Sequence, residues 1–223
     1  MGRDIAIPTP LGPINAWRAD PPNGAAAFGA ILVIQEIFGV NEHIRSVANR
    51  YATQGYTALA PSLFDPVQRH VELGYDEAGF AAGRALVTEL GTERALQQLT
   101  AAVALLRGEG HKVAAVGFCW GGTLAFLANT RLGLPAVSFY GARTLPFLDE
   151  PLRAPMRFHF GEDDASIPAA DIAQHQLRQP NAELQVYPGG HAFNRDVDPG
   201  HYHAESASQA RRDTLRFLEA ALS

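Results

Sequence analysis

The sequence has a single cysteine among its 223 residues, so no disulfide can form within the chain. The fold must therefore be held by its core. Basic residues are also few, 18 against 23 acidic ones, which gives a formal net charge of −5. Such a charge offers no general attraction to a polyanion and argues against nucleic acid as a partner.

Long apolar segments are missing as well. No stretch approaches the roughly 20 apolar residues that span a bilayer, so we expect no membrane association. Residues 1–6 lack the apolar stretch of a signal peptide, and Ala6 stands where a myristoylation motif requires Ser or Thr. Together with the lone thiol, these absences predict a cytoplasmic protein.

Motifs for cofactors and metals are also absent. The sequence has no Gly-x-x-x-x-Gly-Lys-Ser/Thr phosphate loop, and no Gly-x-Gly-x-x-Gly follows the first apolar run. Eight histidines are present, but none forms a His-Glu-x-x-His motif, and His201 and His203 lack companion ligands. We therefore expect neither a cofactor nor a metal.

The sequence does contain short apolar runs that alternate with helical patterns. An antiparallel hairpin is predicted where 4–9 and 14–18 flank Pro10-Leu11-Gly12-Pro13. Further strands are predicted at 30–34, 57–60, 113–116, 136–139, 156–160 and 184–187. Helices are predicted at 42–53, from Thr92 as N-cap through 106, and at 121–129, 169–177 and 204–223.

This alternation predicts an α/β fold, with a mostly parallel central sheet, helices on both faces and the antiparallel hairpin at the N-terminal edge. Glycines and prolines are spread along the chain and mark no linker, so we expect one domain over 1–223. In such sheets functional residues gather beyond the carboxyl ends of the strands.

The strongest chemical signal is Gly117-Phe118-Cys119-Trp120-Gly121-Gly122, between a predicted strand and a predicted helix. A nucleophile elbow has this layout, because flanking glycines let strand and helix pass closely while the reactive side chain projects from a strained turn. A lone cysteine is otherwise a small buried apolar residue. Here the helix N-terminus favours a thiolate, so Cys119 is the predicted nucleophile of an α/β-hydrolase.

An α/β-hydrolase presents its acid and then its histidine later in the chain, each after a strand. Asp164 follows the predicted strand 156–160, and His191 follows the predicted strand 184–187. His191 would take the proton from the nucleophile, and Asp164 would fix the imidazole tautomer. Asp163 is the competing acid, and a solvated loop histidine is the alternative interpretation of His191.

Backbone N–H groups are expected to stabilise the oxyanion that forms on attack. Trp120 supplies one from the elbow, and Ile37 supplies a second from the loop after the first buried strand. Glu36 is a carboxylate at the mouth of that apolar strand. It either pairs with an arginine such as Arg45 or lies near Cys119 and takes part in controlling its protonation.

Two aromatic residues near these motifs, Tyr140 and Phe38, are candidates for contact with substrate. Core packing is the alternative for both, because aromatic side chains on buried elements are mostly core residues.

The chain resembles the dienelactone hydrolase family nearly from end to end. Besides the elbow, the resemblance rests on Gln35-Glu36-Ile37-Phe38-Gly39-Val40-Asn41, Tyr140-Gly141 and Gly190-His191-Ala192-Phe193. It implies a triad of Cys119, Asp164 and His191 with Glu36 beside the thiol, and an oxyanion hole made by Ile37 and Trp120.

The resemblance also implies that arginines hold a substrate carboxylate. Arg195, a few residues after the predicted catalytic histidine, matches one of them. Arg69 is a candidate for the second, in a segment, 61–69, that departs from the family's usual sequence.

The implied activity is that of a carboxylic ester hydrolase which opens a dienelactone-type enol lactone or a similar small, anionic, activated ester. Attack by the thiol would give an acyl-enzyme that water then cleaves, and the setting would be the degradation of aromatic compounds. Hydrolysis of another small ester or thioester is an alternative, and so is a binding protein that keeps the fold without turnover. The sequence favours neither a monomer nor a homo-oligomer.

Overall fold

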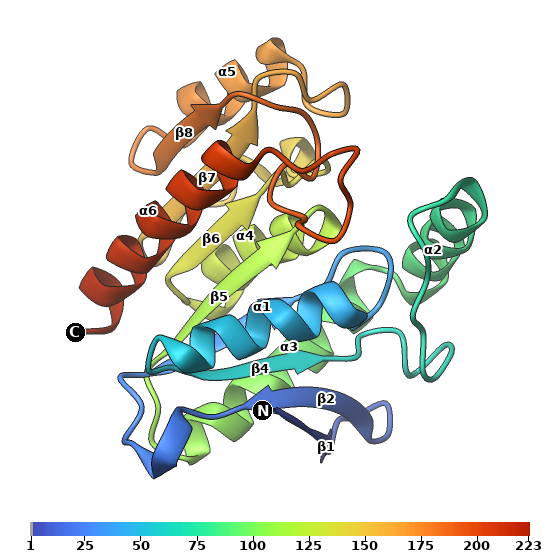
Figure 1. Ribbon diagram of the computed structural model, residues 1–223, viewed down its shortest axis with the longest axis vertical. Coiled ribbons are helices and arrows are strands. Elements are labelled where there is room, and N and C mark those ends of the chain that lie inside the picture. The colour runs from blue at the N-terminus through green and yellow to red at the C-terminus, as the bar shows by residue number, and fades with distance from the viewer. Residues whose placement is uncertain (1) are drawn as a thin grey trace. The chain divides into compact units, whose positions relative to one another are not determined.

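The computed structural model describes residues 2–223 (Figure 1). These residues fall into two compact units, 2–114 with Leu222 and 115–221 with Ser223. Met1, with which the predicted domain begins, lies outside the described residues. Within that described part, no helix is long and apolar enough to cross a membrane. A single domain stays a prediction.

The first unit holds four strands in the order β1-β2-β4-β3. Antiparallel pairs join β1 to β2 and β2 to β4, whereas β3 and β4 run parallel, so the N-terminal hairpin is confirmed. The elements are β1 (Arg3–Ile7), β2 (Ile14–Ala19), η1 (Pro22–Gly24), β3 (Ala30–Ile34), α1 (Glu42–Thr53), β4 (Thr57–Pro61), α2 (Glu77–Leu90) and α3 (Thr92–Gly108).

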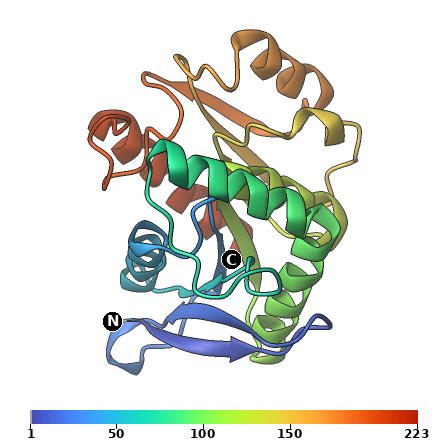
Figure 2. The same cartoon turned by 90° about the vertical axis from the view of Figure 1, so that its right-hand side faces the viewer.

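Helices α1 and α3 cover opposite faces of these strands (Figure 2). Helix α1 begins where the Asn41 side chain accepts a hydrogen bond from the N–H of Ile44 at 3.3 Å. Its buried face includes Ile44, Val47, Ala48 and Tyr51, which recur at helical spacing. Every residue of β3 and β4 is buried, as continuous apolar runs predict for strands covered on both faces.

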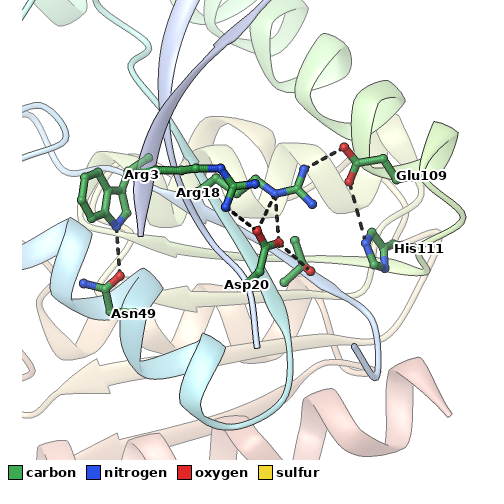
Figure 3. Close-up of polar contacts among 8 residues, drawn as sticks. Arg3, Arg18, Asp20, Asn49, Glu109 and His111 are labelled. Carbon is green, nitrogen blue, oxygen red and sulfur yellow. Dashed lines mark hydrogen bonds and ion pairs between the residues drawn. The ribbon is translucent and has the colours of Figure 1, made fainter. Parts of the chain in front are cut away.

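Charged side chains tie the end of β2 to the end of α3 (Figure 3). Arg18 Nε donates to Asp20 at 2.9 Å, and Arg18 Nη1 donates to Glu109 at 2.7 Å. The bond to Glu109 contributes most to raising the pKa of Arg18. Arg3 also reaches Asp20, at 2.9 Å, but its side chain is exposed, and exposed ion pairs contribute little stability.

Two features of α2 and α3 differ from the sequence prediction. Helix α2 was not predicted, because its buried face begins with Gly79 and Gly83 and only later carries apolar side chains. Thr92 was predicted as the N-cap of α3 but is its first helical residue. The cap is Gly91, whose φ of 71° makes the one-residue break between the two helices.

The second unit contains most of β5 and a fully parallel arrangement in the order β5-β6-β7-β8. Helices α4 and α6 lie on opposite faces of these strands (Figure 1). The elements are β5 (Val113–Phe118), α4 (Trp120–Leu132), β6 (Ala136–Phe139), η2 (Leu145–Phe147), β7 (Met156–Gly161), α5 (Ala169–Arg178), β8 (Glu183–Tyr187) and α6 (Ala204–Leu222).

The register of this unit brings its loops together at one end. Phe118 pairs with Phe139, and Gly161 pairs with Tyr187, so the carboxyl ends of neighbouring strands are level. The segments that follow β5, β6, β7 and β8 therefore emerge side by side.

Candidate active site

Cys119 occupies a strained turn between β5 and α4. Its φ of 54° lies in the left-handed region, which residues other than glycine seldom adopt. The Cys119 N–H donates to the carbonyl of Phe139 at 3.0 Å, and its own carbonyl accepts from the N–H of Gly122 at 2.9 Å. A Cβ on Gly117 would lie 1.8 Å from the carbonyl oxygen of Gly121, so strand and helix could not pass this closely with another residue there. Cys119 is partly exposed, as the nucleophile of an elbow is expected to be.

His191 and Asp164 form a close hydrogen-bonded pair. His191 Nδ1 lies 2.7 Å from Asp164 Oδ2. The second carboxylate oxygen of Asp164 accepts from the backbone N–H of Ser166 at 2.8 Å. The Asp164 side chain is fully buried, whereas Asp163 is exposed. The structure therefore brings Asp164, and not Asp163, to the histidine.

Cys119 is the second hydrogen-bond partner of the His191 side chain. Burial alone would lower the pKa of His191, but hydrogen bonds to Asp164 and Cys119 outweigh burial and raise that pKa to about 10. Hydrogen bonds of the imidazole with a carboxylate and with a sulfur together favour the imidazolium. The structure therefore brings the three residues predicted from chain order into contact, since His191 is hydrogen-bonded to both Asp164 and Cys119. Their catalytic roles stay predictions.

Aromatic side chains surround the histidine. Tyr140, which follows β6, is fully buried with a φ of 42°. Its ring centroid is 5.1 Å from that of His191 and 5.6 Å from that of Phe193. Trp120, the predicted oxyanion donor, is the first residue of α4, and the first N–H groups of a helix have no acceptor within it.

Arg195 lies in the turn that follows His191 and is only 2% exposed. Its Nη2 donates to Asp198 Oδ2 at 2.7 Å, and His201 Nδ1 lies 2.8 Å from the same oxygen. Burial tends to raise the pKa of Asp198, but the hydrogen bonds and positive charges of Arg195 and His201 together outweigh burial and lower that pKa. A substrate carboxylate at Arg195 would therefore share the guanidinium with Asp198.

In the first unit, Glu36 and Ile37 lie at the carboxyl end of β3 and are both buried. The preceding Gln35 fixes this segment, because its Oε1 accepts from the N–H of Leu63 at 3.1 Å and its Nε2 donates to the carbonyl of Glu36 at 3.2 Å. A Cβ on Gly83 would lie 2.4 Å from the carbonyl oxygen of Ile37, so α2 packs directly on this backbone.

Arg45 does not show the pairing that was suggested for it with Glu36. Its Nη1 and Nη2 donate to the two carboxylate oxygens of Glu72, at 2.6 and 2.9 Å. The cause is local, because Gly39 and Glu72 form a β-bridge that brings Glu72 to the start of α1.

The other two predicted residues also belong to the first unit. Phe38 is 1% exposed, and its ring packs edge-on against Tyr75 and Phe80 at 4.8 and 4.9 Å. These contacts are of the kind that core packing predicts. Arg69 is exposed, and its Nη2 donates to the carbonyl of Pro13 at 3.0 Å. A position beside Cys119 stays a prediction for both of them, as it does for Glu36 and Ile37.

Some structurally important polar residues were not singled out from the sequence. Gln98 of α3 donates from Nε2 to the carbonyl of Leu63 at 3.0 Å and so holds the same segment as Gln35. His159 is fully buried in β7. The available signal in both cases is a polar residue inside an otherwise apolar pattern. Among residues 2–223, no group of three or more His, Cys, Asp or Glu side chains is placed to hold a metal ion.

Parallel strands with a strained Cys turn after β5, an acid after β7 and a histidine after β8 have the arrangement of an α/β-hydrolase. The model of the dienelactone hydrolase family matches residues 14–222. The chain therefore belongs to the dienelactone hydrolase family.

Two relatives, each named "Putative carboxymethylenebutenolidase", match over most of their length. The Synechocystis sp. protein is 33% identical over 98% of this chain and 96% of its own, and the Yersinia pestis protein is 37% identical over 92% and 82%. A crystal structure named "Putative Dienelactone Hydrolase", from Klebsiella pneumoniae, superposes with a TM-score of 0.87 at 29% identity and covers 97% of each chain. The predicted family and fold class are confirmed, and the protein is a hydrolase that acts on small esters or lactones.

Proposed function

We propose that this hydrolase uses Cys119 as its nucleophile and opens a dienelactone-type enol lactone, or a similar small activated ester, through an acyl-enzyme. The observation that carries the proposal is the series of contacts from Asp164 through His191 to Cys119, at a turn with a φ of 54°. Family membership supports the reaction type, and the name of the relatives agrees with a butenolide-type lactone.

In the proposed first step, the Cys119 thiolate attacks the lactone carbonyl carbon. The bond between that carbon and the enol oxygen breaks, and His191 gives its proton to the departing oxygen. The acyl group remains on sulfur as a thioester, with the opened enol attached to it. The N–H of Trp120, and that of Ile37 as implied by the resemblance, would stabilise the oxyanion in between.

In the second step, water attacks the thioester carbonyl and gives its proton to His191. The bond between carbon and sulfur breaks, which restores the pair of Cys119 and His191 and releases a carboxylic acid that gives its remaining proton to the solvent. Asp164 holds the ring in the tautomer that both steps need. An enol oxygen leaves more readily than an amine, so an activated ester suits a thiolate better than a peptide bond does.

The substrate is proposed to carry a carboxylate that Arg195 binds. The resemblance supports this, and a nearly fully buried guanidinium beside the His191 loop is compatible with it. Arg69, Tyr140 and Phe38 remain proposed substrate contacts, and Glu36 a proposed control on the thiol. A cytoplasmic location, the absence of a cofactor and a role in the degradation of aromatic compounds are proposed on the sequence and the resemblance alone.

The test is the loss of the conjugated ultraviolet absorbance of a dienelactone. We expect turnover by the wild type, none by Cys119→Ala, and a raised KM with a nearly unchanged kcat for Arg195→Ala. A neutral activated ester serves as the control substrate, since its hydrolysis should depend on Cys119 and not on Arg195. A folded wild type that leaves the dienelactone intact would contradict the assignment of substrate.

A further inference from the structure

A chain of four polar side chains lies buried in the second unit, and the proposed mechanism does not use it. Thr214 and Asp213 belong to α6, His159 belongs to β7 and Tyr187 ends β8 (Figure 1). Thr214 and His159 are fully buried, Tyr187 is 1% exposed and Asp213 is 9% exposed. Polar groups at this depth are costly unless they are paired, and the four side chains pair with one another. Asp213 also accepts from Arg216 and lies 3.6 Å from Arg157 Nη2.

The geometry fixes the direction of these hydrogen bonds. Tyr187 Oη donates its only proton to Asp213 Oδ2 at 3.0 Å, so His159 Nδ1, at 2.8 Å from Oη, is the donor in that contact. Burial lowers the pKa of His159 well below its usual range, which leaves one proton on the ring. His159 Nε2 therefore accepts from Thr214 Oγ1 at 3.0 Å. Along the chain, Thr214 donates to His159, His159 donates to Tyr187, and Tyr187 donates to Asp213.

The backbone of Tyr187 connects this chain to the candidate active site. Tyr187 is the last residue of β8, and its carbonyl accepts from the N–H of Glu162 at 2.9 Å. Two residues on, the carbonyl of Gly189 accepts from the N–H of Asp163 at 3.0 Å. These bonds join the loop that carries His191 to the loop that carries the triad acid, directly beyond the anchored tyrosine.

The ring of Tyr187 makes a second connection. Its centroid is 5.5 Å from that of Phe193, Phe193 is 5.6 Å from Tyr140, and Tyr140 is 5.1 Å from His191. Phe193 and Tyr140 are both fully buried. A displacement of the Tyr187 ring would therefore shift the His191 ring, because the packed side chains between them have little room to adjust.

We infer that Tyr187 is a positioning residue for His191, and that its hydroxyl, anchored by His159 and Asp213, fixes where the loop holds the imidazole against Cys119. This inference rests on the proposed function, in which His191 is the base. A displacement of about 1 Å in a catalytic group can cost about 100-fold in rate. Loss of the anchoring hydroxyl of Tyr187 should thus lower the reaction rate as well as the stability of the fold.

The experiment compares Tyr187→Phe with Thr214→Val, since each removes one hydroxyl from the same buried chain. The readouts are the rate at which iodoacetamide alkylates Cys119 at pH 7, kcat and KM on a neutral activated ester, and thermal stability. We expect both variants to lose stability. Only Tyr187→Phe should lower the alkylation rate and kcat, by about 10-fold with KM unchanged, and Thr214→Val should stay within about 2-fold of the wild type.

Two variants of Asp213 complete the test without altering the tyrosine. Asp213→Asn keeps an oxygen that can accept from Tyr187 and should retain the wild-type alkylation rate. Asp213→Ala removes the acceptor and also the partner of Arg157 and Arg216, so it should lose more stability than Tyr187→Phe but lower the alkylation rate by a similar factor. It serves as the test if Tyr187→Phe does not fold.

Equal losses of stability in Tyr187→Phe and Thr214→Val, with wild-type alkylation rates in both, would overturn the inference and leave the proposed function intact. The proposed function fails separately if the wild type is alkylated no faster than the unfolded protein and His191→Ala changes nothing. That outcome also removes the base that Tyr187 would position.

Discussion

Asp164→Asn is the substitution that most sharply tests the electrostatics of the site. The pKa of His191 stands at about 10 because hydrogen bonds to Asp164 and Cys119 outweigh the opposing effect of burial. An ordinary histidine has a pKa of about 6.5. In the wild type the imidazolium should therefore persist through neutral pH, and activity should fall only as the pH rises through about 10.

The asparagine keeps the shape of the side chain and removes its charge. Since the bond to Asp164 is the first of the influences that raise the His191 pKa, we expect the alkaline limit of activity to move toward neutrality by at least about 1 pH unit, or about 1.4 kcal/mol. We also expect kcat to fall by about 10²- to 10⁴-fold, because an amide can stabilise the wrong tautomer.

The assay is the pH dependence of kcat/KM on a neutral activated ester, from pH 5 to 11. Asp163→Asn is a matched control, since it removes one negative charge from the neighbouring, exposed residue. Its profile should coincide with that of the wild type. An alkaline limit near pH 7 in the wild type, or equal shifts in the two variants, would show that Asp164 does not set the pKa of His191.

Two further predictions concern stability. Gly117→Ala should fail to fold or lose several kcal/mol in denaturant unfolding, because its Cβ would lie 1.8 Å from a backbone oxygen, whereas Gly108→Ala, with nothing within 4 Å, should be neutral or stabilising. His159 has a lowered pKa, so the unfolded state binds its proton first and the unfolding free energy should fall as the pH drops below about 6.5, by about 1.4 kcal/mol per pH unit. His159→Gln should remove that part of the slope, and an unchanged slope would show that His159 is protonated in the fold.

Continuous apolar runs made the strands predictable. The predicted bounds of β3, β6 and α1 agree with the structure to the residue, because strands covered on both faces need apolar residues throughout and α1 has a capped, amphipathic pattern. Helix α2 escaped prediction because it packs by backbone contact at Gly83, and a glycine contributes nothing to an apolar stripe.

The order of the motifs along the chain predicted three side chains that the structure brings into contact. It did not decide between Asp163 and Asp164, because both follow the same strand and only the turn after Gly161 determines which one is buried. The hydrogen-bond partners of Tyr187 could not be predicted from the sequence for another reason. They lie 28 and 26 residues away on a different strand and helix, so only the sheet register and helix packing bring them together.

The proposed function requires that Cys119 opens the lactone through an acyl-enzyme. Rapid quenching of the wild type with excess dienelactone, followed by mass spectrometry of the intact protein and its peptides, should detect this intermediate. Because ring opening keeps every atom of the lactone, we predict a mass increase equal to that of the whole lactone, located on the peptide that contains Cys119 and absent in Cys119→Ala. Consumption of the lactone with no adduct on Cys119, or with undiminished turnover by Cys119→Ala, would show that Cys119 is not the nucleophile.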